Sequence, residues 1–242
     1  MASSLQTLWI STARIGRHGL FGFPKTQVVQ LTEYTSHLFS QQTKQSMEGS
    51  YDRIAPIYDL LDLPFEWLYY RKMRKKWIGT LRGEKVLEVG VGTGKNLEYY
   101  HPTNEVVAID RSRGMLSLAA KRRKQHTKLF FQPEIPWQVP SDFTTVVATF
   151  VLCTMKEPQP VLEEIRRHLR LGGKLIIFEF ARSRNPLLYK VEKAINPLTR
   201  LLFGVDFTRK PTIELLGSEW KLVDVNWAIE DMIYQAMIER KK

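Results

Sequence analysis

The chain has 242 residues, which is enough for one α/β domain with an extension but too few for two full-sized domains with separate cores. Hydrophobic residues make up 43% of it, so a substantial core is expected, and no run of about 18 uncharged apolar residues would span a bilayer. The net charge of +11 favours an anionic partner, such as lipid headgroups or nucleic acid, without deciding between them. The single cysteine, Cys153, excludes a disulfide framework and a thiolate metal cluster.

Residues 1–46 differ in composition from the rest of the chain. No Asp or Glu occurs before Glu33, while Arg14, Arg17 and Lys25 lie among many Ser, Thr and Gln residues, which is typical of an organellar transit peptide. We expect a mitochondrial transit peptide here, with a plastid one or a disordered extension as the alternatives, and a folded domain over residues 47–242. If translation starts at Met47, a cytoplasmic location is expected instead.

The folded part alternates short β-branched runs with amphipathic stretches, as a parallel α/β sheet requires. The expected strands are 84–90, 105–110, 128–132, 143–153 and 173–180, followed by an antiparallel closing pair at 221–229 and 232–239. The clearest expected helix covers 158–173, where an apolar stripe ends at Gly172 and Gly173. A second helix is expected to open at Gly94, in the run "GKNLEYY".

A glycine-rich turn follows the first strand, in the run "VLEVGVGTG". Gly90, Gly92 and Gly94 lack side chains, so a ligand can approach the backbone closely at this turn. The spacing G-x-G-x-G differs from the dinucleotide-binding pattern, and Glu88 would repel a pyrophosphate but suit an ammonium group. Asp110 ends the second strand, where its carboxylate can accept hydrogen bonds from ribose hydroxyls. These residues together predict a site for S-adenosylmethionine.

Residues 47 to about 240 resemble a class I S-adenosylmethionine-dependent methyltransferase, a Rossmann-like α/β fold whose seven-stranded, mostly parallel sheet carries helices on both faces. The resemblance rests on "VLEVGVGTGKN", "VVAIDRSRGML", "TFVLCTM" and "EEIRRHLRLGGKLIIFEF". It implies that the three glycines face the methionine moiety, that Asp110 holds the ribose and that Arg111 and Met115 flank the adenine. The acidic residue that many relatives place after the third strand has Glu134 as its counterpart here, in the shortened run "FFQPEIPW".

The run "YDRIAPIYDLLDLP" resembles the opening motif of quinone-ring C-methyltransferases and phosphatidylethanolamine N-methyltransferases. Tyr51 and Tyr58 would share a helical face and cap the cofactor pocket, although tyrosines at this spacing also occur as plain core residues. The run from 196 to 216 is more similar to membrane-bound alkyl-thiol methyltransferases. The resemblance therefore implies a hydrophobic small-molecule or lipid acceptor.

Two stretches carry the expectation of peripheral membrane contact. Residues 65–82 interleave aromatic and aliphatic side chains with Lys and Arg, and residues 185–204 place Leu, Val and Ile at helical intervals near Pro197. The alternative, weighed equally, is that both helices simply cover the sheet and expose a solvated basic face.

Methyl transfer by in-line displacement depends mostly on positioning and requires no metal. His101, His126 and His168 are each expected to be solvated surface residues rather than general bases, and Glu179 is a candidate to orient the acceptor. Two alternatives to a lipid or small-molecule methyltransferase remain open. One is an RNA or protein methyltransferase, which the charge of +11 suggests but the run "TFVLC" disfavours, so nucleic acid is the weaker choice of partner. The other is a non-catalytic assembly factor with a methyltransferase-like fold.

Overall fold

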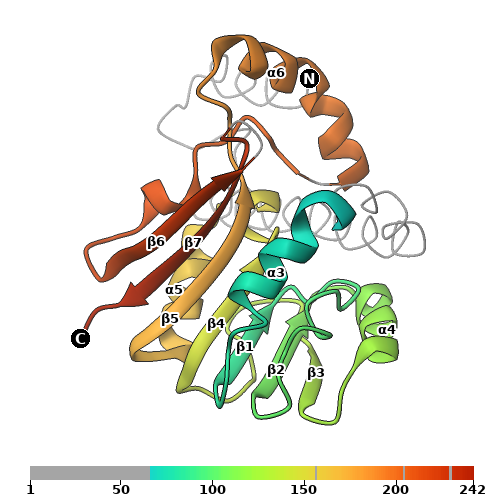
Figure 1. The fold of residues 1–242 in the computed structure, drawn as a ribbon, viewed down its shortest axis with the longest axis vertical. Helices are drawn as coiled ribbons and strands as arrows, with labels where there is room; N and C mark the ends of the chain where they lie inside the picture. The colour runs from blue at the N-terminus through green and yellow to red at the C-terminus, as the bar shows by residue number, and fades with distance from the viewer. Residues whose placement is uncertain (1–65, 156, 204, 229–230) are drawn as a thin grey trace, which may run out of the picture. The chain divides into compact units, whose positions relative to one another are not determined.

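A computed structural model describes residues 66–155, 157–203, 205–228 and 231–242. Its centre is a seven-stranded sheet in the order β3-β2-β1-β4-β5-β7-β6. The strands are β1 (Lys85–Val89), β2 (Glu105–Asp110), β3 (Thr127–Phe131), β4 (Phe143–Thr149), β5 (Leu169–Phe180), β6 (Trp220–Ala228) and β7 (Ile233–Arg240). Strands β1 to β5 pair in parallel, and β7 runs antiparallel between β5 and β6. The predicted mostly parallel sheet with an antiparallel closing pair is confirmed (Figure 1).

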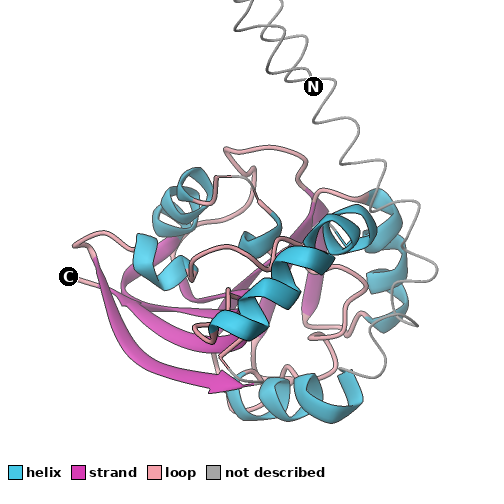
Figure 2. Cartoon of the chain, turned by 90° about the horizontal axis from the view of Figure 1, so that it is seen from above, coloured by secondary structure: helices cyan, strands magenta, loops and turns pink. Residues whose placement is uncertain are grey.

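Helices cover both faces of this sheet. The main helices are α3 (Arg71–Trp77), which continues a π-helical turn, η2 (Glu66–Tyr70), then α4 (Arg113–Arg122), α5 (Gln159–His168) and α6 (Pro186–Phe203). Short 3-10 turns occur before α5, at η3 (Leu152–Thr154), and after α6, at η4 (Thr212–Leu215). The view from above shows helices and loops gathered around the strand ends (Figure 2). None of the helices in the described ranges is long and apolar enough to cross a membrane.

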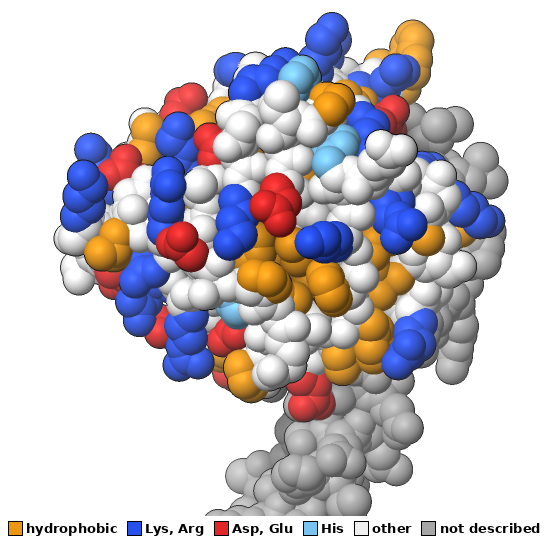
Figure 3. All heavy atoms as spheres, turned by 90° about the horizontal axis from the view of Figure 1, so that it is seen from below, with side chains coloured by type: hydrophobic (Ala, Val, Ile, Leu, Met, Phe, Trp, Pro, Cys, Tyr) orange, Lys and Arg blue, Asp and Glu red, His pale blue; other side chains and the backbone are white. Residues whose placement is uncertain are grey.

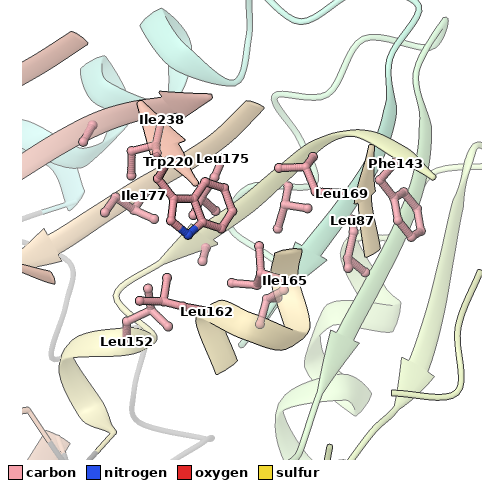
Figure 4. Packing of buried hydrophobic residues seen from close by; sticks show 14 of the residues in the cluster. Leu87, Phe143, Leu152, Leu162, Ile165, Leu169, Leu175, Ile177, Trp220 and Ile238 are labelled. Atoms are coloured by element: carbon pink, nitrogen blue, oxygen red, sulfur yellow. The ribbon is translucent and has the colours of Figure 1, made fainter. Parts of the chain in front are cut away.

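Two hydrophobic clusters hold the layers together, one on each face of the sheet. Alternate residues of β1 point to opposite sides, so Leu87 joins the cluster that contains α5, whereas Val86 joins the cluster that contains α3. The first cluster packs Leu162 and Ile165 of α5 against the central strands (Figure 4). Because both faces are covered, the central strands read as continuous apolar runs rather than as alternating ones.

Two boundaries differ by several residues from those that the sequence predicts. The helix predicted over 158–173 ends at His168, because the chain passes directly into β5, where Leu169 already pairs with Phe143 of β4. The strand predicted over 143–153 ends at Thr149, because Phe150 adopts a left-handed backbone with φ 58°.

The helix predicted from Gly94 is also absent from this part of the structure. The chain forms successive turns there, in which the N–H of Leu97 bonds the carbonyl of Gly94 at 3.0 Å and the N–H of Tyr99 bonds the carbonyl of Asn96 at 3.0 Å. The side chain of Asn96 is engaged with the sheet rather than with solvent. A helix dipole therefore does not contribute at this turn.

Candidate functional site

The candidate site lies where β1, β2 and β4 end. Strands β1 and β4 are neighbours, and the chain leaves β1 toward β2 but leaves β4 toward β5, in opposite directions along the sheet. At such a point the loops diverge, and ligands of open α/β sheets bind in the crevice outside the carboxyl ends of the strands. The glycine turn after β1 and the acid at the end of β2 both lie at this point (Figure 1).

The three glycines have left-handed backbones, with φ of +67° at Gly90, +54° at Gly92 and +86° at Gly94. Their surroundings differ. A Cβ at Gly90 would lie 2.4 Å from the Val151 side chain, and one at Gly94 would lie 2.9 Å from the Cα of Ala119 in α4. A Cβ at Gly92 would meet no atom within 4 Å. Gly90 and Gly94 are therefore required for packing, while Gly92 faces open space that a ligand can occupy.

Asp110 holds this turn in place. Its Oδ2 accepts the backbone N–H of Gly92 at 2.8 Å, and its Oδ1 accepts the backbone N–H of Ser112 at 2.8 Å. Burial raises the pKa of the Asp110 carboxyl, and the N–H bonds from Ser112 and Gly92 partly oppose that rise. Each carboxylate oxygen has a further lone pair, so the group can still accept from a ribose hydroxyl. Asp110 is the last residue of β2, as the sequence predicts.

Glu88 lies beneath the turn and is only 1% exposed. Its Oε1 accepts a hydrogen bond from the Asn96 side-chain amide at 2.8 Å, whereas its Oε2 makes no hydrogen bond of standard geometry among the described residues. Burial raises the pKa of Glu88 to about 7, against the lowering effect of Asn96. The buried Tyr100 hydroxyl is a further side-chain partner of Glu88 and also lowers its pKa. A buried carboxylate with so few good hydrogen bonds is costly, and an ammonium group of a ligand would stabilise it.

A polar network that the sequence analysis missed supports Glu88. Asn96 also donates to the hydroxyl of Thr149, at 3.0 Å, and accepts from Nε of Arg74 at 2.6 Å. Arg74 is buried and pairs with Glu66, which Lys95 approaches at 3.8 Å. The signal available in the sequence was Asn96 itself, a polar residue directly after the glycine motif. Arg74 could not be found, because it lies in a run of exposed basic residues.

The predicted adenine contacts are brought together only in part. Arg111 is half-buried directly after Asp110, and Met115 is buried in the first turn of α4, where its backbone N–H bonds the Ser112 hydroxyl at 3.0 Å. Glu134 is exposed in the segment after β3. Tyr51 and Tyr58 lie outside the described residues.

One prediction on proton carriers is wrong, and another stays a prediction. His168 is buried rather than solvated: its Nδ1 lies 3.0 Å from the Pro140 carbonyl oxygen and its Nε2 lies 3.1 Å from Glu164. Glu179 is fully buried, and its Oε1 accepts the backbone N–H of Leu152 at 3.0 Å. This bond ties Glu179 to η3, and its proposed role in orienting the acceptor stays a prediction.

The strand order, the glycine turn after β1 and the acid that ends β2 together define the fold of a class I methyltransferase. Residues 87–177 match the family described as Methyltransferase domain. The predicted resemblance to S-adenosylmethionine-dependent methyltransferases is thereby confirmed for the domain.

Curated relatives with similar sequences act on different acceptors by name. A phosphatidylethanolamine N-methyltransferase of Cereibacter sphaeroides is 38% identical over 127 residues, which cover 47% of this chain and 59% of the relative. A demethylmenaquinone methyltransferase of Renibacterium salmoninarum is 31% identical over 135 residues, covering 54% and 57%. A thiol S-methyltransferase, TMT1B, of Rattus norvegicus is 26% identical over 160 residues, covering 62% and 65%. The matched part thus spans less than two thirds of each of these relatives.

Solved structures share the fold at low identity. The structure described as a DhpI–SAH complex has a TM-score of 0.62 and 17% identity, and the match covers 82% of this chain and 97% of that one. At this identity the comparison establishes the architecture, not the ligand of this chain.

Proposed function

We propose that this protein binds S-adenosylmethionine and transfers its methyl group to a small hydrophobic or lipid-like acceptor. The observation that carries the proposal is the arrangement of Glu88, Gly92 and Asp110 at one strand edge. The buried Glu88 carboxylate matches the ammonium of this cofactor, the open position over Gly92 matches the chain that faces the backbone, and the Asp110 carboxylate matches the ribose. The residues present therefore fit the cofactor.

The protein's own part in the reaction is binding and orientation. When bound, S-adenosylmethionine supplies a methyl carbon on a positively charged sulfur, and the acceptor atom takes that carbon while the sulfur keeps the bonding electron pair. Asp110 would hold the ribose and, through the N–H of Gly92, keep the turn in its left-handed form. Glu88 would hold the ammonium, and the Asn96 amide keeps that carboxyl oriented. A rigid site of this kind contributes by positioning.

The acceptor class is supported by the relatives, which are named for a quinone, a phospholipid amine and a thiol. The quinone and the phospholipid each have an apolar body. The decisive experiment is calorimetric titration of the full chain with S-adenosylmethionine, followed by transfer of labelled methyl to a demethylated quinol, to phosphatidylethanolamine vesicles and to an alkyl thiol. Failure of the folded protein to bind the cofactor would refute the proposal and favour an assembly factor.

Peripheral contact with an anionic membrane is part of the proposal, and α6 is the element that supports it. Its apolar side chains point outward at helical intervals, namely Leu187, Val191, Ile195 and Leu198. Lys190, Lys193 and Arg200 are exposed on the same helix, whereas its single acid, Glu192, is buried and accepts the Ser183 N–H at 3.0 Å. An exposed apolar stripe flanked only by cations suits anionic lipid.

A vesicle flotation assay tests this contact. Leu198→Glu is expected to abolish binding to phosphatidylserine-containing vesicles. Leu171→Glu is the matched control, since Leu171 is also 57% exposed but lies in β5. Equal binding by both variants would refute the membrane contact.

Nucleic acid is the weaker candidate partner. On the face seen in Figure 3, Lys and Arg side chains are spread among acidic and apolar ones rather than gathered into one basic patch. A salt-sensitive gel shift with RNA, without binding to anionic vesicles, would reverse this order.

A mitochondrial location is likewise proposed from the composition of residues 1–46. Import of a fluorescent fusion that carries these residues is the test. A diffuse cytoplasmic signal from that fusion would contradict the proposal.

A further inference from the structure

Four aromatic rings form a continuous row at the ends of the central strands. The row runs from Tyr70, at the end of η2, through Phe150, after β4, and Phe180, at the end of β5, to Phe207, after α6. Successive ring centroids lie 4.7, 5.0 and 4.7 Å apart. The planes are tilted by 46° and 36° at the first two contacts and are nearly perpendicular at the third, which are favourable geometries for aromatic pairs. We call these four residues the aromatic row.

The backbone at Phe150 is strained to place its ring in the row. A φ of 58° is unfavourable for a bulky L residue, and such outliers persist where the surrounding structure holds them. Here the N–H of Phe150 donates to the carbonyl of Phe178 at 2.7 Å. If the chain had continued as an extended strand, the ring would lie on another side of β4. The strain therefore concentrates at the residue that links the row to β4.

Phe150 also joins the aromatic row to the polar site. The residue before it, Thr149, accepts a hydrogen bond from Asn96, whose amide holds Glu88. The residue after it, Val151, occupies the space beside Gly90 in the glycine turn. One strand end thus has the candidate cofactor residues on one side and an aromatic surface on the other.

Part of the row is exposed at the strand ends, although Phe150 and Phe180 also pack against the hydrophobic cluster that contains α3. Tyr70 is buried, as a core ring is expected to be, but Phe150, Phe180 and Phe207 are each only half-buried. These three rings come from three segments that are remote in sequence and keep part of their surface free at the strand ends. Rings that served the core alone would gain more by complete burial.

We propose that Phe150, Phe180 and Phe207 receive a planar aromatic acceptor, of the quinol or phenol type, beside the bound cofactor. This inference rests on the proposed function and selects one of its three acceptor classes. A planar ring gains ring–ring interactions with these residues, roughly 2- to 13-fold in affinity for each well-placed pair. An alkyl thiol or a phospholipid amine gains only apolar contact from the same surface.

The test measures binding to the full chain with 2-methyl-1,4-naphthoquinone, octanethiol and short-chain phosphatidylethanolamine as separate probes. The informative variants are Phe180→Leu and Phe207→Leu, which remove a ring but keep an apolar side chain. Phe130→Leu is the matched control, because Phe130 is partly exposed on the edge strand β3, outside the row. Cofactor affinity and thermal unfolding of every variant are measured alongside.

We expect naphthoquinone affinity to fall at least about 5-fold in Phe180→Leu and Phe207→Leu, and to stay within about 2-fold in Phe130→Leu. The affinities for octanethiol and phosphatidylethanolamine should fall less than the affinity for naphthoquinone in these variants. Absence of naphthoquinone binding to cofactor-binding wild type overturns the inference, as does an equal loss for all three probes. If Phe180→Leu does not fold, Phe207→Leu decides alone. A wild type that binds naphthoquinone through the row but binds no cofactor refutes the proposed function and leaves the ring site standing.

Discussion

Asp110 accepts the backbone N–H of Gly92 at 2.8 Å, so a side chain at the end of β2 holds the turn that follows β1. The two strands are neighbours, and the N–H of Val91 also donates to the carbonyl of Ile109 at 3.0 Å. The acid therefore has two separable functions, one in shaping the turn and one in the proposed contact with ribose. This separation makes the site testable residue by residue.

Replacement of Asp110 should weaken both cofactor binding and the fold. We expect Asp110→Ala to lower S-adenosylmethionine affinity at least about 10-fold, because hydrogen bonds to a charged acceptor contribute about 1.5–3 kcal/mol each. Stability should fall by about 1–3 kcal/mol, because the N–H groups of Gly92 and Ser112 lose their acceptor. Titration calorimetry and urea unfolding measure the two effects. Asp224→Ala, at an exposed position of β6, should change neither. Unaltered affinity in Asp110→Ala would remove the residue from the site.

The glycines should separate binding from stability. Gly92→Ala is expected to cost only about 1 kcal/mol, from the strain of its left-handed backbone, since its Cβ meets no neighbour. Cofactor binding should nevertheless be lost, because the methyl group fills the proposed ligand space. Gly94→Ala should cost more than about 2 kcal/mol, since its Cβ lies 2.9 Å from the Cα of Ala119. Urea unfolding and calorimetry on both variants test this. Normal cofactor binding by Gly92→Ala would contradict the site.

The buried amide of Asn96 should be a major contributor to stability. Asn96→Ala removes hydrogen bonds to Arg74, Glu88 and Thr149 and leaves two buried charged groups with fewer partners. We expect a loss of about 2–4 kcal/mol in the free energy of unfolding. The exposed Asn226 of β6 provides the control, and Asn226→Ala should cost less than about 0.5 kcal/mol. A similar small loss in both variants would show that the network is not stabilising.

The sheet was largely predictable because its strands are short apolar runs buried on both faces, and such runs are visible without a partner. The ends of the helices and strands were less predictable. Leu169 and Leu171 fit the apolar stripe of the preceding helix, but pairing of Leu169 with Phe143 draws that segment into β5. Periodicity alone cannot weigh a tertiary hydrogen-bond ladder against a local helix.

The candidate site could be predicted where its residues lie at strand ends that the sequence marks. It could not be predicted where a contact joins segments that are distant in the sequence. Glu88, Gly92 and Asp110 lie at strand ends that the sequence marks. Arg74 reaches the site through Asn96 from a helix that reads as a uniformly basic stretch, and its burial depends on how α3 packs on the sheet. The strained backbone at Phe150 likewise has no signature in the run "TFVLC".

Stability should fall as pH rises through neutrality, because burial raises the pKa of Glu179 from 4.5 to about 7. A carboxyl whose pKa is raised on folding favours the fold while it is protonated, so its contribution is complete below about pH 4.5 and is lost as pH rises through 7. For Glu179 this amounts to about 2 kcal/mol between pH 5.5 and 8.5. Glu179→Gln keeps an oxygen to accept the Leu152 N–H but cannot ionise, so urea unfolding at the two pH values should show a smaller difference than in wild type. In Glu163→Gln the difference should stay that of wild type, because the hydrogen bond from Arg166 lowers the pKa of Glu163 and moves its titration below this range. An identical pH dependence in Glu179→Gln and wild type would show that this carboxyl does not titrate near neutrality.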